Sequence, residues 1–205
     1  MSVTVSKHTV YVSDCQQERS RAVPKDRGDV RRRMQEAALE LFHEKGYDGT
    51  TAAEIAARAG VTERTFFRYF PDKREVLFNE AALHAGLSTA IAEAPPTLGP
   101  LEVVVWAFQS LAPMFEENLP FAELGQAVIA QTPALQERQL AKSAAITQTI
   151  AEALQLRGIE PGIARLASAT GMAVTGHGLQ AWVLEPSSPL VEHLEKALRA
   201  LRGLS

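Results

Sequence analysis

The sequence predicts an all-α protein in which an N-terminal three-helix unit precedes a larger helical domain. Apolar residues recur at three- and four-residue spacings along most of the chain after residue 28. Capping residues and glycines bracket short segments between residues 46 and 78, and prolines precede or open most later segments. The 205 residues are 46% hydrophobic and 22% charged, as in ordinary folded proteins. We therefore divide the chain into 1–27, 28–78 and 79–205.

Residues 1–27 show no helical periodicity and mix polar residues, charges and Pro24, so we interpret them as a flexible basic arm. A helix is expected from Asp29, with a stop at Gly46. Its apolar stripe comprises Val30, Met34, Ala37, Ala38, Leu41 and Phe42. The arginines at 31–33 oppose the dipole of this helix, a placement that a nearby phosphate would offset. Two interpretations of the arm stay open: insertion into a DNA minor groove, or a basic tail without contacts.

A second helix is expected from Thr51 to Gly60. Glu54 follows Thr51 at capping-box spacing, and Ile55, Ala56 and Ala59 form its apolar stripe. A glycine between two short helices lets the chain turn with positive φ, which is typical of a helix-turn-helix.

A third helix is expected from Thr62 to Phe70, because Pro71 disfavours helical geometry in the residue before it. Asp72 and Glu75 repeat the capping spacing and predict a fourth helix that runs to about Glu93.

The third helix has two faces with different chemistry. At 100° per residue, Phe66 and Phe70 point inward, whereas Arg64, Thr65, Phe67 and Arg68 point outward. Arginine donates two hydrogen bonds to a guanine edge, hydroxyls reach phosphates, and an aromatic ring contacts a thymine methyl group. This outward stripe therefore favours a DNA major groove.

The run AALELFHEKGYDGTTAAEIAARAGVTERTFFRYFPDKREVLF, from residue 37 to Phe78, resembles the DNA-binding domain of the TetR family of bacterial transcriptional regulators. The resemblance implies that the remainder is a helical domain that pairs two subunits and holds a small effector. It also implies DNA contacts by Thr51, Glu63, Arg64, Thr65, Phe67, Arg68, Tyr69 and Lys73. For Thr51, Glu63 and Tyr69 a structural role as cap, dipole partner or packing group stays open. Arg68 stands where relatives often have histidine, which leaves the base preference open.

The overall charge does not oppose DNA binding. The formal net charge is −3, but residues 1–80 contain 14 Lys/Arg and 13 Asp/Glu, whereas residues 81–205 contain 7 and 11. The field that acts on DNA is local, because salt screens charges beyond about 8–10 Å. The positive charge is concentrated towards the N-terminus.

Other classes of protein lack their signatures. The lone Cys15 and five scattered histidines show no metal-ligand spacing, and no nucleophile motif or phosphate loop occurs, so we expect no metal, no cofactor and no enzyme activity. No apolar run approaches the roughly 20 residues that a membrane span requires. We expect a bacterial cytoplasmic protein.

The second domain is expected to contain helices over 101–118, 121–131, 133–157, 161–184 and 189–202, and Pro113 is expected to kink or divide the first of these. Candidates for the apolar lining of a ligand pocket are Trp106, Phe108, Met114, Phe115, Phe121, Met172 and Trp182, although most of these are expected to be ordinary core residues. His177 is a polar candidate for the same pocket. A stripe of small residues and the apolar face of the last helix predict a four-helix dimer interface. Its members are Gly171, Thr175, Gly178, Leu190, Leu194, Ala197, Leu198 and Leu201.

The sequence therefore predicts a dimeric DNA-binding regulator. We expect a repressor that a small, partly apolar effector releases from a near-palindromic operator, with the signal passing through the fourth helix. Activation of transcription stays open as an alternative to repression, because the direction of regulation depends on the position of the operator. The alternative is a ligand-binding or protein-interaction module that keeps the fold without operator binding.

Overall fold

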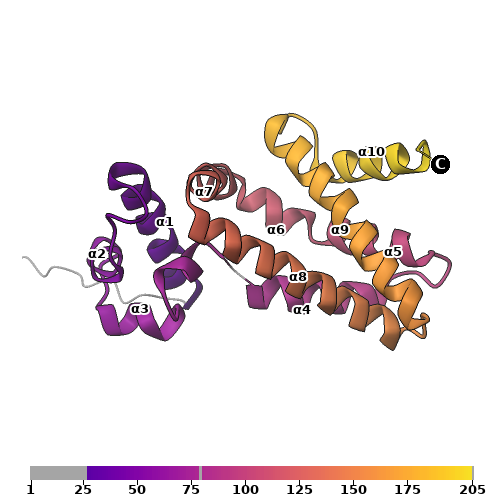
Figure 1. Ribbon diagram of the computed structural model, residues 1–205, viewed down its shortest axis with the longest axis horizontal. Coiled ribbons are helices and arrows are strands. Elements are labelled where there is room, and N and C mark those ends of the chain that lie inside the picture. The colour runs from indigo at the N-terminus through magenta and orange to yellow at the C-terminus, as the bar shows by residue number, and fades with distance from the viewer. Residues whose placement is uncertain (1–26, 79, 205) are drawn as a thin grey trace, which may run out of the picture.

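The protein is described by a computed structural model that covers residues 27–78 and 80–204. All regular structure in these residues is helical, and none of them lies in a β-strand. Figure 1 shows a small N-terminal unit, the head, beside a larger body in which the long helices α8 and α9 run side by side. The head contains α1 (Arg27–Lys45), α2 (Ala52–Arg58), α3 (Glu63–Tyr69) and a 3₁₀ helix, η1 (Lys73–Leu77).

The body contains the remaining helices. They are α4 (Glu80–Glu93), α5 (Pro100–Ser110), α6 (Ala112–Glu117), α7 (Leu119–Gln131), α8 (Pro133–Leu156), α9 (Pro161–Leu184) and α10 (Leu190–Arg202). Five of them, α5 to α9, have proline in the first turn. Backbone N–H groups in the first turn have no partner within the helix, so the N–H group that proline lacks is not missed there. The predicted helix over 101–118 is divided at Leu111, where α5 ends and α6 begins.

The head forms where its sequence signals predict. The apolar stripe of α1 is buried, and Gly46 ends the helix with φ +79°. Gly60 makes the turn between α2 and α3 with φ +70°, a conformation that L-residues with a side chain rarely adopt. The predicted arm lies outside the described residues except Arg27, the first residue of α1.

The prediction of one continuous helix from Asp72 to Glu93 is wrong. Asp72 does cap a helix, since its carboxylate accepts from the backbone N–H groups of Arg74 (2.7 Å) and Glu75 (3.3 Å). That helix is the short η1, because Phe78 is extended (φ −125°, ψ 126°). The Glu75 carboxylate pairs with Arg138 of α8, and Arg31 donates to the Phe78 carbonyl oxygen (3.1 Å). Tertiary contacts therefore override the local helical signal.

The head core extends across the predicted domain boundary at residue 78. Ile129 of α7 and Leu135 of α8 belong to the same buried cluster as the aromatic residues Phe66 and Phe70 of α3. The body has a separate buried cluster built mainly from α4, α5, α8, α9 and α10. The two units thus share packing through the junction of α7 and α8.

The small-residue stripe of α9 packs against α5 and α10 of the same chain, and the dimer interface expected from these residues stays a prediction. A Cβ added to Gly171 would lie 2.5 Å from Val104 Cγ1 of α5, and one added to Gly178 would lie 3.1 Å from the Leu194 Cα of α10. Thr175, Leu190, Leu194 and Ala197 are buried, and Leu198 and Leu201 pack against the same core. This stripe lets α5 and α10 approach α9 closely.

Candidate nucleic-acid interface

Helix α3 divides its side chains between the head core and the surface. Phe66 and Phe70 are fully buried, with ring centroids 5.4 Å apart. Phe67 is 50% exposed, and Glu63, Arg64 and Arg68 are exposed. Thr62 caps the helix, because its hydroxyl accepts from the Thr65 backbone N–H (3.2 Å). The outward stripe expected from the sequence is therefore the exposed face of α3.

Two arginines on this face keep their charge uncompensated. No carboxylate of the described residues lies within ion-pair distance of Arg64 or Arg68, although the Arg68 guanidinium lies 5.2 Å from the Tyr69 ring centroid. The other arginines of the head whose side chains are described are engaged: Arg32, Arg33, Arg58 and Arg74 pair with carboxylates, and Arg31 donates to a carbonyl oxygen. The three successive arginines of α1 thus have structural partners without a phosphate.

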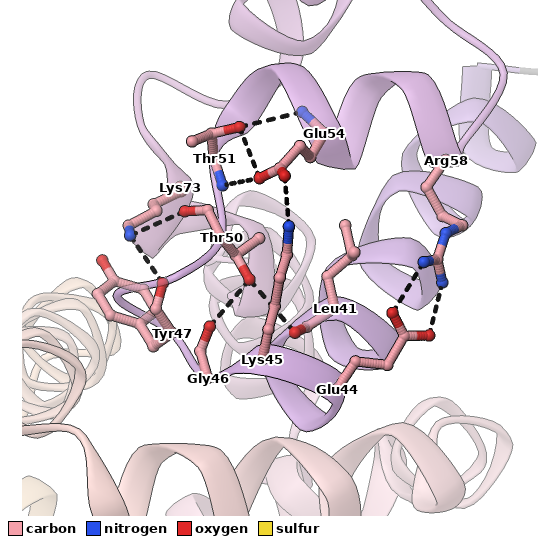
Figure 2. Close-up of polar contacts among 10 residues, drawn as sticks. All are labelled: Leu41, Glu44, Lys45, Gly46, Tyr47, Thr50, Thr51, Glu54, Arg58 and Lys73. Carbon is pink, nitrogen blue, oxygen red and sulfur yellow. Dashed lines mark hydrogen bonds and ion pairs between the residues drawn. The ribbon is translucent and has the colours of Figure 1, made fainter.

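Thr51 and Glu54 form the predicted capping box at the start of α2 (Figure 2). The Glu54 carboxylate accepts from the Thr51 backbone N–H and hydroxyl, both at 2.8 Å, and Lys45 pairs with its second oxygen. The Lys45 ammonium, followed by the two Thr51 donors, lowers the pKa of Glu54 to about 2. The Thr51 hydroxyl oxygen accepts from the Glu54 backbone N–H (3.2 Å), which is the capping role that the sequence left open.

The side chain of Lys73 is directed towards the head and not outward, as a DNA contact would require. Figure 2 shows its ammonium group directed at the loop after α1, where it donates to the carbonyl oxygens of Tyr47 (2.8 Å) and Thr50 (3.0 Å). It also lies 4.1 Å from the Tyr47 ring centroid. The Thr50 hydroxyl donates to the Gly46 carbonyl oxygen (2.9 Å) in the same loop. Lys73 therefore fixes the loop that precedes α2, and its predicted phosphate contact stays a prediction.

The predicted pocket residues do not form one site. Phe108 and Trp182 are buried in the body core, Met172 packs against it, and His177 is exposed. Trp106 is half-buried beside Leu111 at a surface groove, and Phe121 lies in α7 among residues whose side chains are outside the description. Among the predicted pocket residues whose side chains the structure describes, only Met114 and Phe115 line a cavity between head and body. The sequence does not distinguish apolar side chains that pack in a core from apolar side chains that line a cavity.

That cavity was missed by sequence reasoning because six segments build it. Its volume is about 380 Å³, and its walls come from α1, the end of η1, α4, α6, α7 and α8. Leu77 and Phe78 belong to the head side, whereas Leu83 and Ile146 belong to the body. No local spacing signals such a site, since each segment contributes only one to four residues.

Residues 27–78 and 80–204 contain neither a cluster of potential metal ligands nor a helix that could span a membrane. No three or more His, Cys, Asp or Glu side chains there lie close enough together to bind a metal ion. Within the same ranges no helix combines the length and the apolar character that crossing a bilayer demands.

Comparison with known proteins places these features in a family. The family model for bacterial regulatory proteins of the tetR family matches residues 36–81. The HTH-type transcriptional regulator TcmR of Streptomyces glaucescens is 37% identical over 75 residues, which are 36% of this chain and 33% of that protein. An uncharacterized HTH-type regulator of Bacillus subtilis, YvkB, is 40% identical over 58 residues. The chain thus matches about a third of the length of these relatives.

Solved structures match over most of the chain. FadR of Thermus thermophilus, a TetR family transcriptional repressor, is 28% identical with a TM-score of 0.50, and the match covers 83% of this chain and 92% of FadR. A TetR-family regulator from Syntrophomonas wolfei has a TM-score of 0.61 at 21% identity over 87% of this chain and 96% of its own, and it supports the fold. The chain is therefore a member of the tetR family of bacterial regulatory proteins.

Proposed function

We propose that the protein is a DNA-binding transcriptional repressor that reads its operator through α3. The observation that carries this proposal is the exposed face on which Arg64 and Arg68 flank Phe67 without carboxylate partners among the residues that the structure describes. A major groove admits an α-helix, and arginine there donates two hydrogen bonds to guanine. Uncompensated arginines also gain from release of counterions when they meet phosphates. An α3 that served only the fold would have no need of this stripe.

The proposed active form is a homodimer. Because the small-residue stripe is occupied within the chain, the interface is assigned to the outer face of α9, where Ile163, Leu166 and Leu184 are exposed together with Leu156 at the end of α8. A second copy would remove this apolar surface from water. Two heads related by a two-fold axis reach major grooves about 34–36 Å apart or a multiple of that spacing, so the operator is expected to be near-palindromic.

The proposed effector site is the cavity between head and body. A ligand there would contact Leu77 and Phe78 of the head and Leu83 and Ile146 of the body at once. If the ligand binds the DNA-bound and the DNA-free conformations of the protein with different affinities, it changes the affinity of the protein for DNA. A typical coupling free energy changes it by about 5- to 150-fold. FadR of Thermus thermophilus was solved in complex with lauroyl-CoA, which supports a ligand-responsive repressor.

The test is selection of bound fragments from a random DNA duplex library at physiological salt. We expect a near-palindromic motif with the unmodified protein. Arg64→Ala should blur one position of each half-site and weaken specific binding by about 1–3 kcal/mol. Arg199→Ala, which removes an exposed arginine of α10 and so the same charge, is the control and should leave the motif unchanged.

Two outcomes would contradict the proposal. If folded protein selects no motif, the chain is a ligand-binding or protein-interaction module that keeps the fold without operator binding. If Arg64→Ala lowers binding to selected and random duplexes equally, Arg64 contributes only charge, and α3 does not read bases through it.

A further inference from the structure

One carboxylate on the exposed face of α3 has no cationic partner. Among the described residues of the head, 27–78, the acidic side chains without an ion pair are those of Asp48 and Glu63. The others all pair with arginine or lysine: Asp29, Glu36, Glu40, Glu44, Glu54, Asp72 and Glu75. Asp48 lies in the loop between α1 and α2, whereas Glu63 is the exposed first residue of α3. Glu63 therefore brings an uncompensated negative charge to the face that we propose for DNA.

The sequence of α3 gives Glu63 no cation within the helix. Residues three and four positions apart on a helix lie side by side, and for Glu63 these are the buried Phe66 and the exposed Phe67. Arg64 is the next residue, and adjacent residues on a helix do not face each other. The Phe67 ring packs edge-on against Phe66, with centroids 5.5 Å apart and an interplanar angle of 89°. Glu63 and Phe67 thus form one ridge of α3, and Arg64 and Arg68 form the next.

A negative charge at this position opposes DNA binding unless a base compensates it. Duplex DNA carries one negative charge per about 1.7 Å of its axis, and salt screens only in part the charges that lie within about 8–10 Å of each other. In the major groove, the cytosine N4 and adenine N6 amino groups can donate to a carboxylate. Adenine presents its N7 acceptor beside N6, which would repel the second carboxylate oxygen, whereas cytosine presents no acceptor beside N4. Cytosine is therefore the base that fits a carboxylate.

We infer that each operator half-site contains a cytosine whose N4 amino group donates a hydrogen bond to the Glu63 carboxylate. This inference rests on the proposed function and names a base that α3 selects. A hydrogen bond to an ionised acceptor is stronger than one between neutral groups. Thymine O4 and guanine O6 are themselves acceptors and would repel the carboxylate. Glu63 thus adds specificity by penalising the wrong bases, at a cost in affinity for phosphates.

A purely structural role for Glu63 leads to a different result. A carboxylate in the first turn interacts with the positive end of the helix dipole, and this interaction does not involve DNA. Removing the carboxylate would then lower the stability of the head and leave the base preference unchanged. Glu192 provides the matched control, because it is an exposed carboxylate in the first turn of α10.

The test repeats the selection from a random duplex library with variants of the full chain. The unmodified protein should prefer cytosine at one position of each half-site where Glu63→Gln prefers adenine, since a glutamine amide bonds the N6 and N7 edge of adenine. Glu63→Ala should show no preference there, and Glu192→Gln should select the unmodified motif. Both Glu63 variants should bind random duplexes about twofold or more tightly than the unmodified protein, because a negative charge is removed.

Titrations of single duplexes separate a direct contact from an indirect effect. Exchange of the selected C·G pair for T·A should weaken binding of the unmodified protein about 5- to 150-fold, the usual cost of one mismatched base pair. The same exchange should change the affinity of Glu63→Ala by less than about twofold, because the carboxylate that distinguishes the two pairs is absent. Urea unfolding of each variant establishes that it is folded.

Two results would overturn the inference. One is selection of the same bases at every position by the unmodified protein and both Glu63 variants. The other is a base different from cytosine, in the unmodified motif, at the position that the Glu63 variants change. Failure of the proposed function is recognised separately, because in that case the unmodified protein itself selects no motif.

Discussion

Replacing Gly125 with leucine tests whether the cavity between head and body is the ligand site. Gly125 is buried in α7 and lines the cavity, and a Cβ added to it meets no heavy atom of the described residues within 4 Å. A leucine side chain at this position projects into the space that a ligand would occupy. Gly125→Ala is the matched control, because it changes the backbone preference in the same way but adds one carbon atom.

The expected magnitudes follow from two contributions. Removing glycine from a helix interior favours folding by about 0.5–1 kcal/mol in both variants. In Gly125→Leu, the side chain displaces roughly three methylene groups of bound ligand at about 0.8 kcal/mol each, or about 2.4 kcal/mol in total. The affinity for an apolar probe, decan-1-ol, should therefore fall about 50-fold in Gly125→Leu and by less than about fourfold in Gly125→Ala.

The assay pairs urea unfolding with titration calorimetry of decan-1-ol and with operator binding. Both variants should unfold at urea concentrations equal to or above that of the unmodified protein, and both should bind the operator. Gly125→Leu alone should lose most of its affinity for decan-1-ol. If a stably folded Gly125→Leu binds decan-1-ol with unchanged affinity, the probe occupies another site and the assignment of this cavity is wrong.

Four further outcomes are expected. Glu54→Gln should have a lower melting temperature than the unmodified protein above pH about 4.5, and the two melting temperatures should converge towards pH 2. The pKa of Glu54 is lowered to about 2 in the folded state, so the stability that its carboxylate contributes is lost as the pH falls through this window. A difference in melting temperature that stays constant across a pH series would contradict this. Lys73→Met should destabilise the head by about 1–3 kcal/mol in urea unfolding, because two carbonyl oxygens lose their donor, whereas Lys196→Met should not. Phe66→Ala should cost about 3–5 kcal/mol of stability, while Phe67→Ala should weaken operator binding in gel-shift titrations with little change in stability. Gly171→Ala should be less stable than Gly176→Ala by about 1–3 kcal/mol, because only the first meets Val104, and sedimentation should show an unchanged oligomeric state in both.

The head could be predicted from the sequence because its determinants are local. Thr51 and Glu54 lie three residues apart, and the box that they form requires no other segment. Gly46 and Gly60 have the positive φ values that glycine favours, and Pro71 ends α3 as expected. The inward and outward faces of α3 follow from helical periodicity alone.

The body could be predicted only as a set of helices. Small residues on one face of α9 indicate a close helix approach, but spacing does not say whether the approaching helix belongs to the same chain. Val104 and Leu194 occupy that face within the chain. Likewise, hydrophobicity marks Phe108 and Phe115 equally, although the first is core and the second lines the cavity. Both distinctions depend on the relative positions of helices that are far apart in sequence.

The proposed coupling between a ligand and DNA binding depends on residues that both line the cavity and belong to the head core. Leu77 and Ile129 line the cavity and are also part of the buried core of the head. That core includes Phe66 and Phe70, on the inner side of the helix whose outer side presents Arg64 and Arg68. Close-packed interiors transmit displacement instead of absorbing it. A ligand that moves Leu77 or Ile129 therefore acts on the orientation of α3 through side-chain packing, without requiring α4 to continue into the head as a rigid helix.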